Sequence, residues 1–223
     1  MDIFLTVVEY IGVISFALSG SAIAVSKKTD AVGALVFALL TCFGGGFIRD
    51  ITLGVTPRIL TVPSYRWLAL TCVVVALLCF IMAFIPKTAN FLTKHQHNFV
   101  VDFTDAVGLS VFCIFGVNVA IEVCGGDNSL LLIFCGCITG VGGGMLRDVF
   151  SAEIPFILRK HIYLIPTIVG TVFYTFTYDK IPYIASMLIS VGIIITLRVL
   201  AIVFKWNLPV PHGAGDGIKE KTN

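Results

Sequence analysis

A ten-residue segment that carries three glycines and an Arg-Asp pair occurs twice in this chain. Residues 41–50 read TCFGGGFIRD and residues 139–148 read TGVGGGMLRD, so the two copies are 98 positions apart. Both copies lie in apolar sequence, where a charged pair is costly to bury in lipid. Glycine-rich, charged segments at corresponding places in two halves of a chain are typical of transporters and channels. The duplication therefore indicates a membrane pathway.

The composition indicates an integral membrane protein. The 223 residues are 57% hydrophobic and 13% charged, and the mean hydropathy is +1.00, whereas soluble proteins carry about 25% charged residues. A membrane span needs about 20 apolar residues, and seven runs qualify: roughly 3–25, 31–54, 67–85, 102–123, 130–150, 162–178 and 183–204. We predict an all-α integral membrane fold of seven transmembrane helices. We expect one transmembrane domain over residues 1–208 and a flexible cytoplasmic tail over 209–223.

The basic residues between the spans predict the orientation. If the N-terminus is outside, only Arg58, Arg66 and Lys180 fall outside. Cytoplasmic loops carry an excess of Lys and Arg. We therefore expect a multi-pass protein of a prokaryotic plasma (inner) membrane with its N-terminus outside and its C-terminus in the cytoplasm. In this orientation nine basic residues are cytoplasmic: Lys27, Lys28, Lys87, Lys94, Arg159, Lys160, Lys205, Lys219 and Lys221.

Spans 1–3 and spans 4–6 then run in opposite senses, so the repeat is predicted to be inverted. We expect repeat A over about 3–85, repeat B over about 102–178 and an extra helix over about 183–204. Inverted repeats place their functional centre at the repeat interface near the bilayer midplane. The match between the halves extends beyond the glycines to further pairs: Pro57 with Pro155, Tyr65 with Tyr163, Glu9 with Asp105, Gly12 with Gly108, Phe16 with Phe112 and Gly20 with Gly116.

Two interpretations of the glycines stay open. Three consecutive glycines lower helix stability by about 1 kcal/mol each relative to Ala, and an opened helix would present backbone carbonyls to an alkali cation. Thr41 and Thr139, one turn earlier, would add hydroxyl oxygens. The second interpretation is close helix packing, which a GxxxGxxxG face favours. The first predicts helices broken at two runs that line the ion pathway: Gly44, Gly45 and Gly46, and Gly142, Gly143 and Gly144.

The charged pairs also allow two interpretations. Adjacent residues on a helix do not face each other, so each arginine is expected to pair with an acid elsewhere, and the pairs either gate the two mouths or serve as structural ion pairs. The pairs are Arg49 with Asp50 and Arg147 with Asp148. The candidate partners are Glu9, Asp102, Asp105 and Glu122, of which Glu9 and Asp105 would also supply negative potential at the entrances.

In these motifs the chain resembles the prokaryotic branch of the trimeric intracellular cation (TRIC) channel family, over about residues 3–200. The resemblance implies a homotrimer of seven-helix protomers, each with its own pore for K⁺ and Na⁺. A group described as putative glycine transporters overlaps this branch, so a secondary transporter of a small amino acid such as glycine is the alternative. The resemblance is carried by Phe16-Ala17-Leu18-Ser19-Gly20, by Asp105-Ala106-Val107-Gly108-Leu109 and by the two glycine motifs, the second followed by Ile154-Pro155.

Other classes find little support in the residues. Neither glycine run continues into Lys-Ser/Thr or follows a strand, as a nucleotide-binding loop would require. Cys135 and Cys137 form a Cys-x-Cys with no accompanying His, so we expect no metal beyond permeant K⁺ and Na⁺. We also expect no cofactor, no enzymatic activity and no nucleic-acid partner. Lys205-Trp206 is typical of an interfacial anchor, which makes membrane lipids a partner.

Overall fold

The computed structural model describes residues 3–85, 99–159, 163–204 and 206, and every regular element within these residues is a helix. The predicted all-α class is confirmed, whereas the predicted tail at 209–223 lies outside the described residues. The helices in chain order are α1 (Ile3–Ser26), α2 (Ala31–Thr52), α3 (Arg58–Thr61), α4 (Tyr65–Met82), α6 (Phe99–Cys124), α7 (Ser129–Phe150), α8 (Phe156–Arg159), α9 (Leu164–Thr177) and α10 (Tyr183–Val203).

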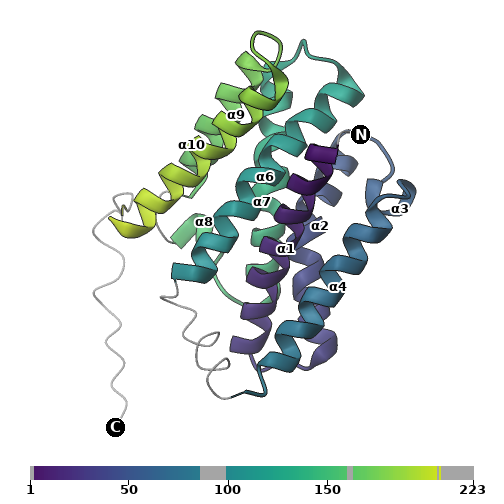
Figure 1. Cartoon of the computed structure of the whole chain (residues 1–223), viewed down its shortest axis with the longest axis vertical. Coiled ribbons are helices and arrows are strands. Elements are labelled where there is room, and N and C mark those ends of the chain that lie inside the picture. The colour runs from purple at the N-terminus through teal and green to yellow at the C-terminus, as the bar shows by residue number, and fades with distance from the viewer. Residues whose placement is uncertain (1–2, 86–98, 160–162, 205, 207–223) are drawn as a thin grey trace, which may run out of the picture.

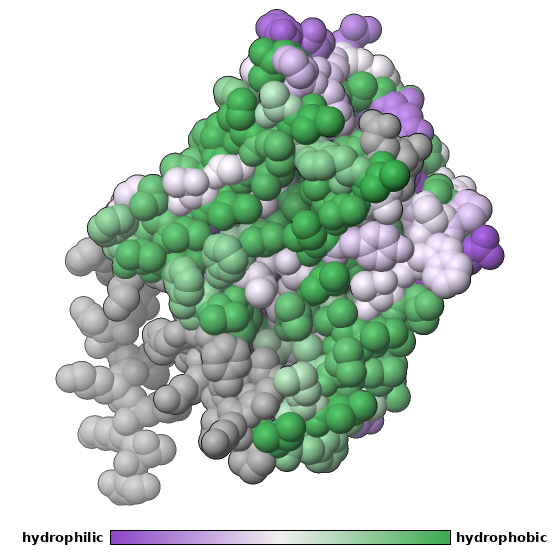
Figure 2. All heavy atoms as spheres, in the orientation of Figure 1, coloured by the Kyte–Doolittle hydropathy of each residue, from purple (hydrophilic) through white to green (hydrophobic). Residues whose placement is uncertain are grey.

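Six helices are long and apolar enough to cross a membrane, namely α1, α2, α4, α6, α7 and α10. They agree with six of the predicted spans to within a few residues. The predicted span at 162–178 corresponds to α9, which is apolar but has 14 residues, fewer than the roughly 20 of an average crossing. Apolar side chains cover most of the visible surface (Figure 2).

The starts of α2 and α7 are set by equivalent caps. The Asp30 side chain accepts a hydrogen bond from Gly33 N at 2.8 Å, and the Asn128 side chain accepts one from Leu131 N at 3.1 Å. Such a cap satisfies one of the free N–H groups of the first helical turn. Asp30 and Asn128 are separated by the same 98 positions as the two glycine motifs. Both copies therefore begin the glycine-rich helix in the same way.

Four helices make the centre of the bundle. α2 packs on α7 and α1 packs on α6, while α1 also packs on α2 and α6 on α7. α4 packs against α1 and α2, whereas α9 and α10 pack against α6 and each other. Figure 1 shows α4 on one side of this centre and α9 with α10 on the other. The arrangement places both glycine motifs inside the protein.

α1 and α6 cross through matching glycine and phenylalanine positions. A Cβ at Gly12 would lie 3.4 Å from a ring carbon of Phe112, and a Cβ at Gly108 would overlap the ring of Phe16. The rings of Phe16 and Phe112 stack with their centroids 5.3 Å apart. Since the earlier position of each helix meets the later position of the other, α1 and α6 run antiparallel.

α2 and α7 are continuous helices through their glycine runs, so the predicted helix breaks are wrong. A Cβ at Gly45 would overlap the carbonyl oxygen of Thr139, and a Cβ at Gly143 would overlap that of Thr41. The glycines let the two backbones touch, as small residues do where membrane helices pack closely. A continuous helix also keeps the backbone polar groups bonded, which a lipid environment requires.

Candidate functional site

The crossing of α2 and α7 brings the two predicted threonines to the centre of the bundle. The Thr41 hydroxyl donates to the Phe37 carbonyl at 2.6 Å, and the Thr139 hydroxyl donates to the Cys135 carbonyl at 2.5 Å. Each hydroxyl proton is therefore used inside its own helix. The hydroxyl oxygens keep lone pairs as acceptors, so both threonines can still offer an oxygen to a cation or to water.

The first glycine of each run also lies at the contact between α2 and α7. A Cβ at Gly44 would come within 2.6 Å of Leu146 Cδ1, and a Cβ at Gly142 would come within 3.0 Å of Gly45 Cα. Real Cβ atoms rarely approach so closely, because packing at this density repels added volume. Together with the middle glycines, these positions form the contact surface of the crossing.

The last glycine of each run has room around it. The nearest atom to a Cβ at Gly46 would be Arg49 Nη2 at 3.6 Å, and the nearest to one at Gly144 would be the Tyr163 hydroxyl at 3.5 Å, followed by Arg147 Nη2 at 3.6 Å. These are ordinary van der Waals distances. Gly46 and Gly144 therefore face the buried charges rather than the partner helix.

On one side of the crossing lies a group that we call the Glu9 cluster, made of Glu9, Arg49, Asp50 and Tyr65. Arg49 donates from Nε and Nη2 to Asp50 Oδ1, over 2.9 and 2.6 Å. The Glu9 carboxylate lies beside the Tyr65 hydroxyl and within Coulombic reach of Arg49. Glu9, Arg49 and Asp50 are each at most 4% exposed. Buried charges need partners; the Arg49 guanidinium is bonded to Asp50 and attracts Glu9 over a longer distance.

On the other side lies the Asp105 cluster, made of Asp105, Arg147, Asp148, Tyr163 and Arg198. Asp105 accepts from Arg147 Nη1 at 2.9 Å and from the Tyr163 hydroxyl at 2.7 Å. Arg198 Nη2 lies 3.9 Å from Asp105 Oδ2, and its guanidinium carbon is 4.0 Å from the centre of the Tyr163 ring. That distance allows a cation–π interaction. Two arginines face two aspartates, so the charges of this cluster balance.

The pairing of Arg49 with the next residue corrects the prediction that each arginine binds an acid on another element. The prediction rested on the diverging directions of adjacent side chains, but the long arginine side chain spans that angle when the neighbouring carboxylate is turned toward it. Arg147 pairs both with the adjacent aspartate and with an acid on another helix. Its Nε donates to Asp148 at 2.9 Å, and its Nη1 donates to Asp105 on α6.

Each neighbouring aspartate is held by a short helix that sequence reasoning did not predict. Asp50 Oδ2 accepts from the backbone N–H of Arg58 at 2.7 Å, at the start of α3. Asp148 Oδ2 accepts from the backbone N–H of Phe156 at 2.9 Å, at the start of α8. The two oxygens of each carboxylate thus join its arginine to a loop helix.

The remaining candidate acids lie elsewhere. Glu122, near the end of α6, accepts from Arg58 Nη1 at 3.0 Å in a pair whose glutamate is largely exposed. Asp102 lies in the first turn of α6.

A pocket borders the Glu9 cluster. All four members of the cluster line it, and so do Thr139 of α7 and Gly46 and Cys42 of α2. It offers a volume of about 30 Å³ to the centres of water molecules, which is room for roughly two waters at ~10–15 Å³ each. The pocket therefore joins a buried carboxylate to the α2–α7 crossing.

Two differences in composition distinguish the Asp105 cluster from the Glu9 cluster. Ser19 of α1 accepts from Arg147 Nη1 at 2.6 Å, whereas the matching position of the other half holds Phe115, which lines the pocket. Arg198 comes from α10, which follows the second repeat segment. The Asp105 cluster is thus filled by a hydroxyl and a second guanidinium.

Sequence reasoning missed the roles of Ser19, Tyr163 and Arg198. Arg198 did carry a signal, because an arginine inside an apolar run is costly unless it is paired. Tyr163 carried a weaker one as the repeat partner of Tyr65. Ser19 carried none, since its repeat partner is the apolar Phe115.

A family model described as glycine transporter matches two segments of the chain, residues 6–83 and 102–179. One model thus matches each half separately. The UPF0126 inner membrane protein YadS of Escherichia coli K12 is 36% identical over 214 residues, which cover 93% of this chain and 95% of YadS.

Solved structures give matches over nearly the whole chain. A TRIC cation channel superposes with a TM-score of 0.81 at 32% identity, covering 96% of this chain and 99% of the channel chain. The TRIC trimeric intracellular cation channel orthologue from Rhodobacter sphaeroides superposes with a TM-score of 0.77 at 28% identity, covering 91% and 99%.

Proposed function

This chain belongs to the glycine transporter family, and we propose that it is an inner-membrane cation channel that conducts K⁺ and also Na⁺. The observation that carries the proposal is the match to a TRIC cation channel at 32% identity over 96% of the chain. Conduction needs no catalytic group. It needs a hydrated path whose ion sites are weak enough to release the ion.

The proposed path follows the α2–α7 crossing within one protomer. The pocket supplies room for water together with the Glu9 carboxylate and the Thr139 hydroxyl, which are oxygen ligands suited to alkali cations. Beyond the crossing, Arg147 and Arg198 would repel a cation until they move. We therefore assign the Asp105 cluster the role of a gate and the Glu9 cluster the role of an entrance.

We propose that the two halves form an inverted repeat within a single transmembrane domain over residues 1–208, with α10 as the extra helix. The antiparallel contacts of α1 with α6 and of α2 with α7 support this relation. The two separate matches of one family model also support it. In this arrangement α9 is the shortened sixth of seven spans.

The proposed orientation places the N-terminus outside and the C-terminus in the cytoplasm. Two ion pairs support the alternation of the spans on which this orientation rests, because each joins segments that the charge count assigns to the same side. Lys27 Nζ lies 2.7 Å from Glu153 Oε1, between two cytoplasmic loops. Arg58 Nη1 lies 3.0 Å from Glu122 Oε2, between two outer segments.

We propose a homotrimer with one pore per protomer. The solved structure from Rhodobacter sphaeroides is named a trimeric cation channel. The pocket is lined by residues of α1, α2, α3, α4, α6 and α7 and so lies among the helices of the protomer, which supports a path inside each protomer.

The alternative is a secondary transporter of a small amino acid such as glycine, which the description of the family model favours. Both proposals can be tested on one preparation. Purified protein in planar bilayers with KCl on both sides should give discrete single-channel openings. Proteoliposomes should show no saturable glycine counterflow. Counterflow without openings would overturn the channel proposal in favour of the carrier.

A further inference from the structure

We infer that the pocket beside Glu9 binds one monovalent cation, in the place that the Arg198 guanidinium takes in the other half of the molecule. The inference rests on the proposed function and adds a defined binding site to its pathway. It starts from a difference in charge between two otherwise matching clusters.

Among the described residues, the Glu9 cluster carries one carboxylate more than its positive charges balance. Arg49 stands against Glu9 and Asp50, all nearly inaccessible to solvent. The nearby Arg58 does not change the balance, because it is paired with Glu122. Burying a charge without an opposite charge is strongly unfavourable, so a carboxyl group in this place either takes up a proton or gains a cation. A bound cation would restore the balance.

The Asp105 cluster shows what a balanced version looks like. Arg198 lies 3.9 Å from Asp105 and 4.0 Å from the centre of the Tyr163 ring. The repeat partners of Asp105 and Tyr163 are Glu9 and Tyr65, which both line the pocket. In the Asp105 cluster the acid and the tyrosine are therefore next to the Arg198 guanidinium, whereas in the Glu9 cluster the acid and the tyrosine are next to the pocket.

The pocket favours a small monovalent cation. Its room for about two waters suits an ion that has lost part of its hydration shell. Glu9 offers carboxylate oxygens, and the Tyr65 and Thr139 hydroxyls offer neutral ones. A divalent ion such as Ca²⁺ takes six or more oxygen ligands, usually with several carboxylates, and Arg49 would repel its second charge. By analogy with the Arg198 side chain, we expect the pocket to bind the free guanidinium ion in addition to K⁺.

The test measures thermal unfolding of the full-length protein in nanodiscs against K⁺ and against guanidinium, far below denaturing concentrations. N-methyl-D-glucamine keeps the ionic strength constant. A ligand that binds only the folded state raises the unfolding temperature in a saturable way. We expect such a rise in the wild type and in Asp127→Asn, which removes an exposed acid on the same side. We expect its loss in Glu9→Gln.

A second variant tests the comparison with Arg198. Arg198→Met removes the tethered cation and leaves Asp105 with Arg147 alone. Guanidinium should then raise the unfolding temperature by more than in the wild type, because it replaces the missing group. If Glu9→Gln does not fold, Tyr65→Phe decides, because it removes a hydroxyl that lines the pocket and leaves the Glu9 carboxylate in place. This variant should need a higher K⁺ concentration for the same rise.

The outcomes separate the site from the channel. An unchanged rise in folded Glu9→Gln, or in Tyr65→Phe where Glu9→Gln does not fold, would overturn the inferred site. The absence of any extra rise in Arg198→Met would overturn the comparison with Arg198. Single-channel currents without a Glu9-dependent rise would leave the channel standing and remove the site. A Glu9-dependent rise without single-channel currents would support the inferred cation site and contradict the channel proposal.

Discussion

Arg147 donates to Asp148, Asp105 and Ser19 from a position that is 1% exposed. Its removal would leave two carboxylates with only Arg198, which makes no hydrogen bond through its buried Nε within the described structure. Breaking a buried ion pair costs far more than forming one gains, because the remaining charge is left without a partner. Arg147 is therefore a structural residue as well as a candidate gate.

We predict that Arg147→Ala lowers the free energy of unfolding by about 3–5 kcal/mol. The matched control is Arg58→Ala, whose partner Glu122 is largely exposed and whose loss should cost only about 0.2–1 kcal/mol. Reversible unfolding in mixed micelles measures both. Equal effects of the two substitutions would contradict the ion-pair assignment. A folded Arg147→Ala protein with unchanged conductance, selectivity and gating would contradict its role as a gate.

The thiol of Cys42 can be used to test whether the pocket lies on the ion path. It lines the pocket, and its sulfur lies 3.6 Å from that of Cys72, which is fully buried. Ag⁺ is a monovalent cation that binds soft thiolate ligands, so it should enter the proposed path, react with Cys42 and block the current. Cys42→Ala should conduct normally and resist Ag⁺, although six other cysteines remain. Block that persists in Cys42→Ala would place the path elsewhere.

At the scale of elements, the glycine runs set the distance between α2 and α7. We predict that Gly45→Ala and Gly143→Ala each destabilise the protein by about 1–3 kcal/mol, the range for overpacking, because the new methyl group overlaps a backbone carbonyl. Gly46→Ala and Gly144→Ala are the matched controls. They have room for the methyl group and should be neutral or stabilising by up to about 1 kcal/mol through helix propensity. The unfolding temperatures of the four variants test this prediction. An equal decrease in all four would contradict the close contact of α2 and α7 at Gly45 and Gly143.

The elements that the sequence predicts well are those whose signal is local. The long apolar runs and the caps at Asp30 and Asn128 define the long helices to within a few residues. The meaning of the glycine runs is not local, because close packing and helix breaking require the same residues. The tertiary structure distinguishes the two, because both helices are continuous and Thr139 lies opposite Gly45. The four-residue helices α3 and α8 are likewise stabilised by carboxylates outside their own sequence.

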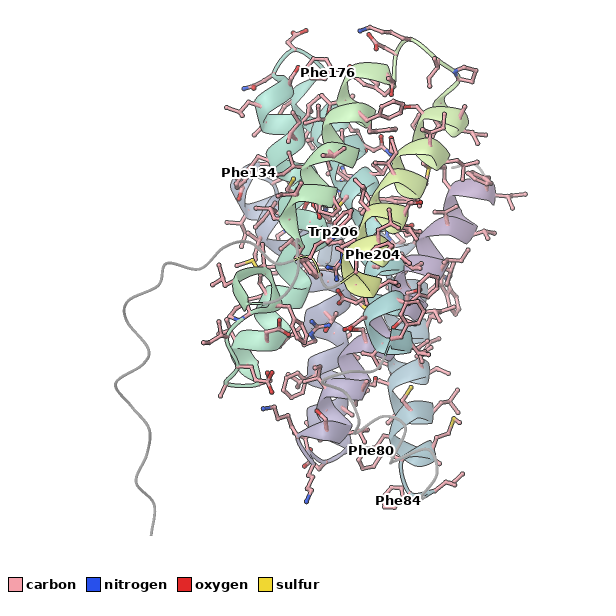
Figure 3. The ribbon with its side chains drawn as sticks, turned by 90° about the vertical axis from the view of Figure 1, so that its left-hand side faces the viewer. Phe80, Phe84, Phe134, Phe176, Phe204 and Trp206 are labelled. Atoms are coloured by element: carbon pink, nitrogen blue, oxygen red, sulfur yellow. The ribbon has the colours of Figure 1, made fainter. Side chains whose placement is uncertain are left out.

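At the scale of the whole molecule, the charge clusters depend on helices that are distant in sequence. The duplication predicted that Glu9 and Asp105 would occupy matching places, and Asp105 was the one of four candidate acids that the structure pairs with Arg147. The duplication could not predict Arg198, because α10 has no counterpart in the repeat and its docking on α6 and α9 depends on tertiary packing. The aromatic side chains Phe134 and Phe176 lie on the outside of the bundle (Figure 3), as expected for a surface in contact with lipid. The asymmetry between the two clusters therefore arises from the added helix, which supplies Arg198, and from Ser19, whose matching position holds Phe115.

The orientation test bears on the whole arrangement, because α9 is short enough that its crossing must be established by experiment. If all seven apolar helices cross, a cytoplasm-dependent reporter fused after Asn223 should be active, and one fused before Asp2 should be inactive. If α9 does not cross, the C-terminus moves to the same side as the N-terminus, and both fusions give the same result. A reporter inserted at Gly126, between α6 and α7, serves as the internal control and should be inactive. An inactive C-terminal reporter together with an inactive N-terminal one would contradict the seventh span. An active reporter at Gly126 together with an inactive N-terminal one would contradict the inverted repeat, since four crossings place that loop on the same side as the N-terminus.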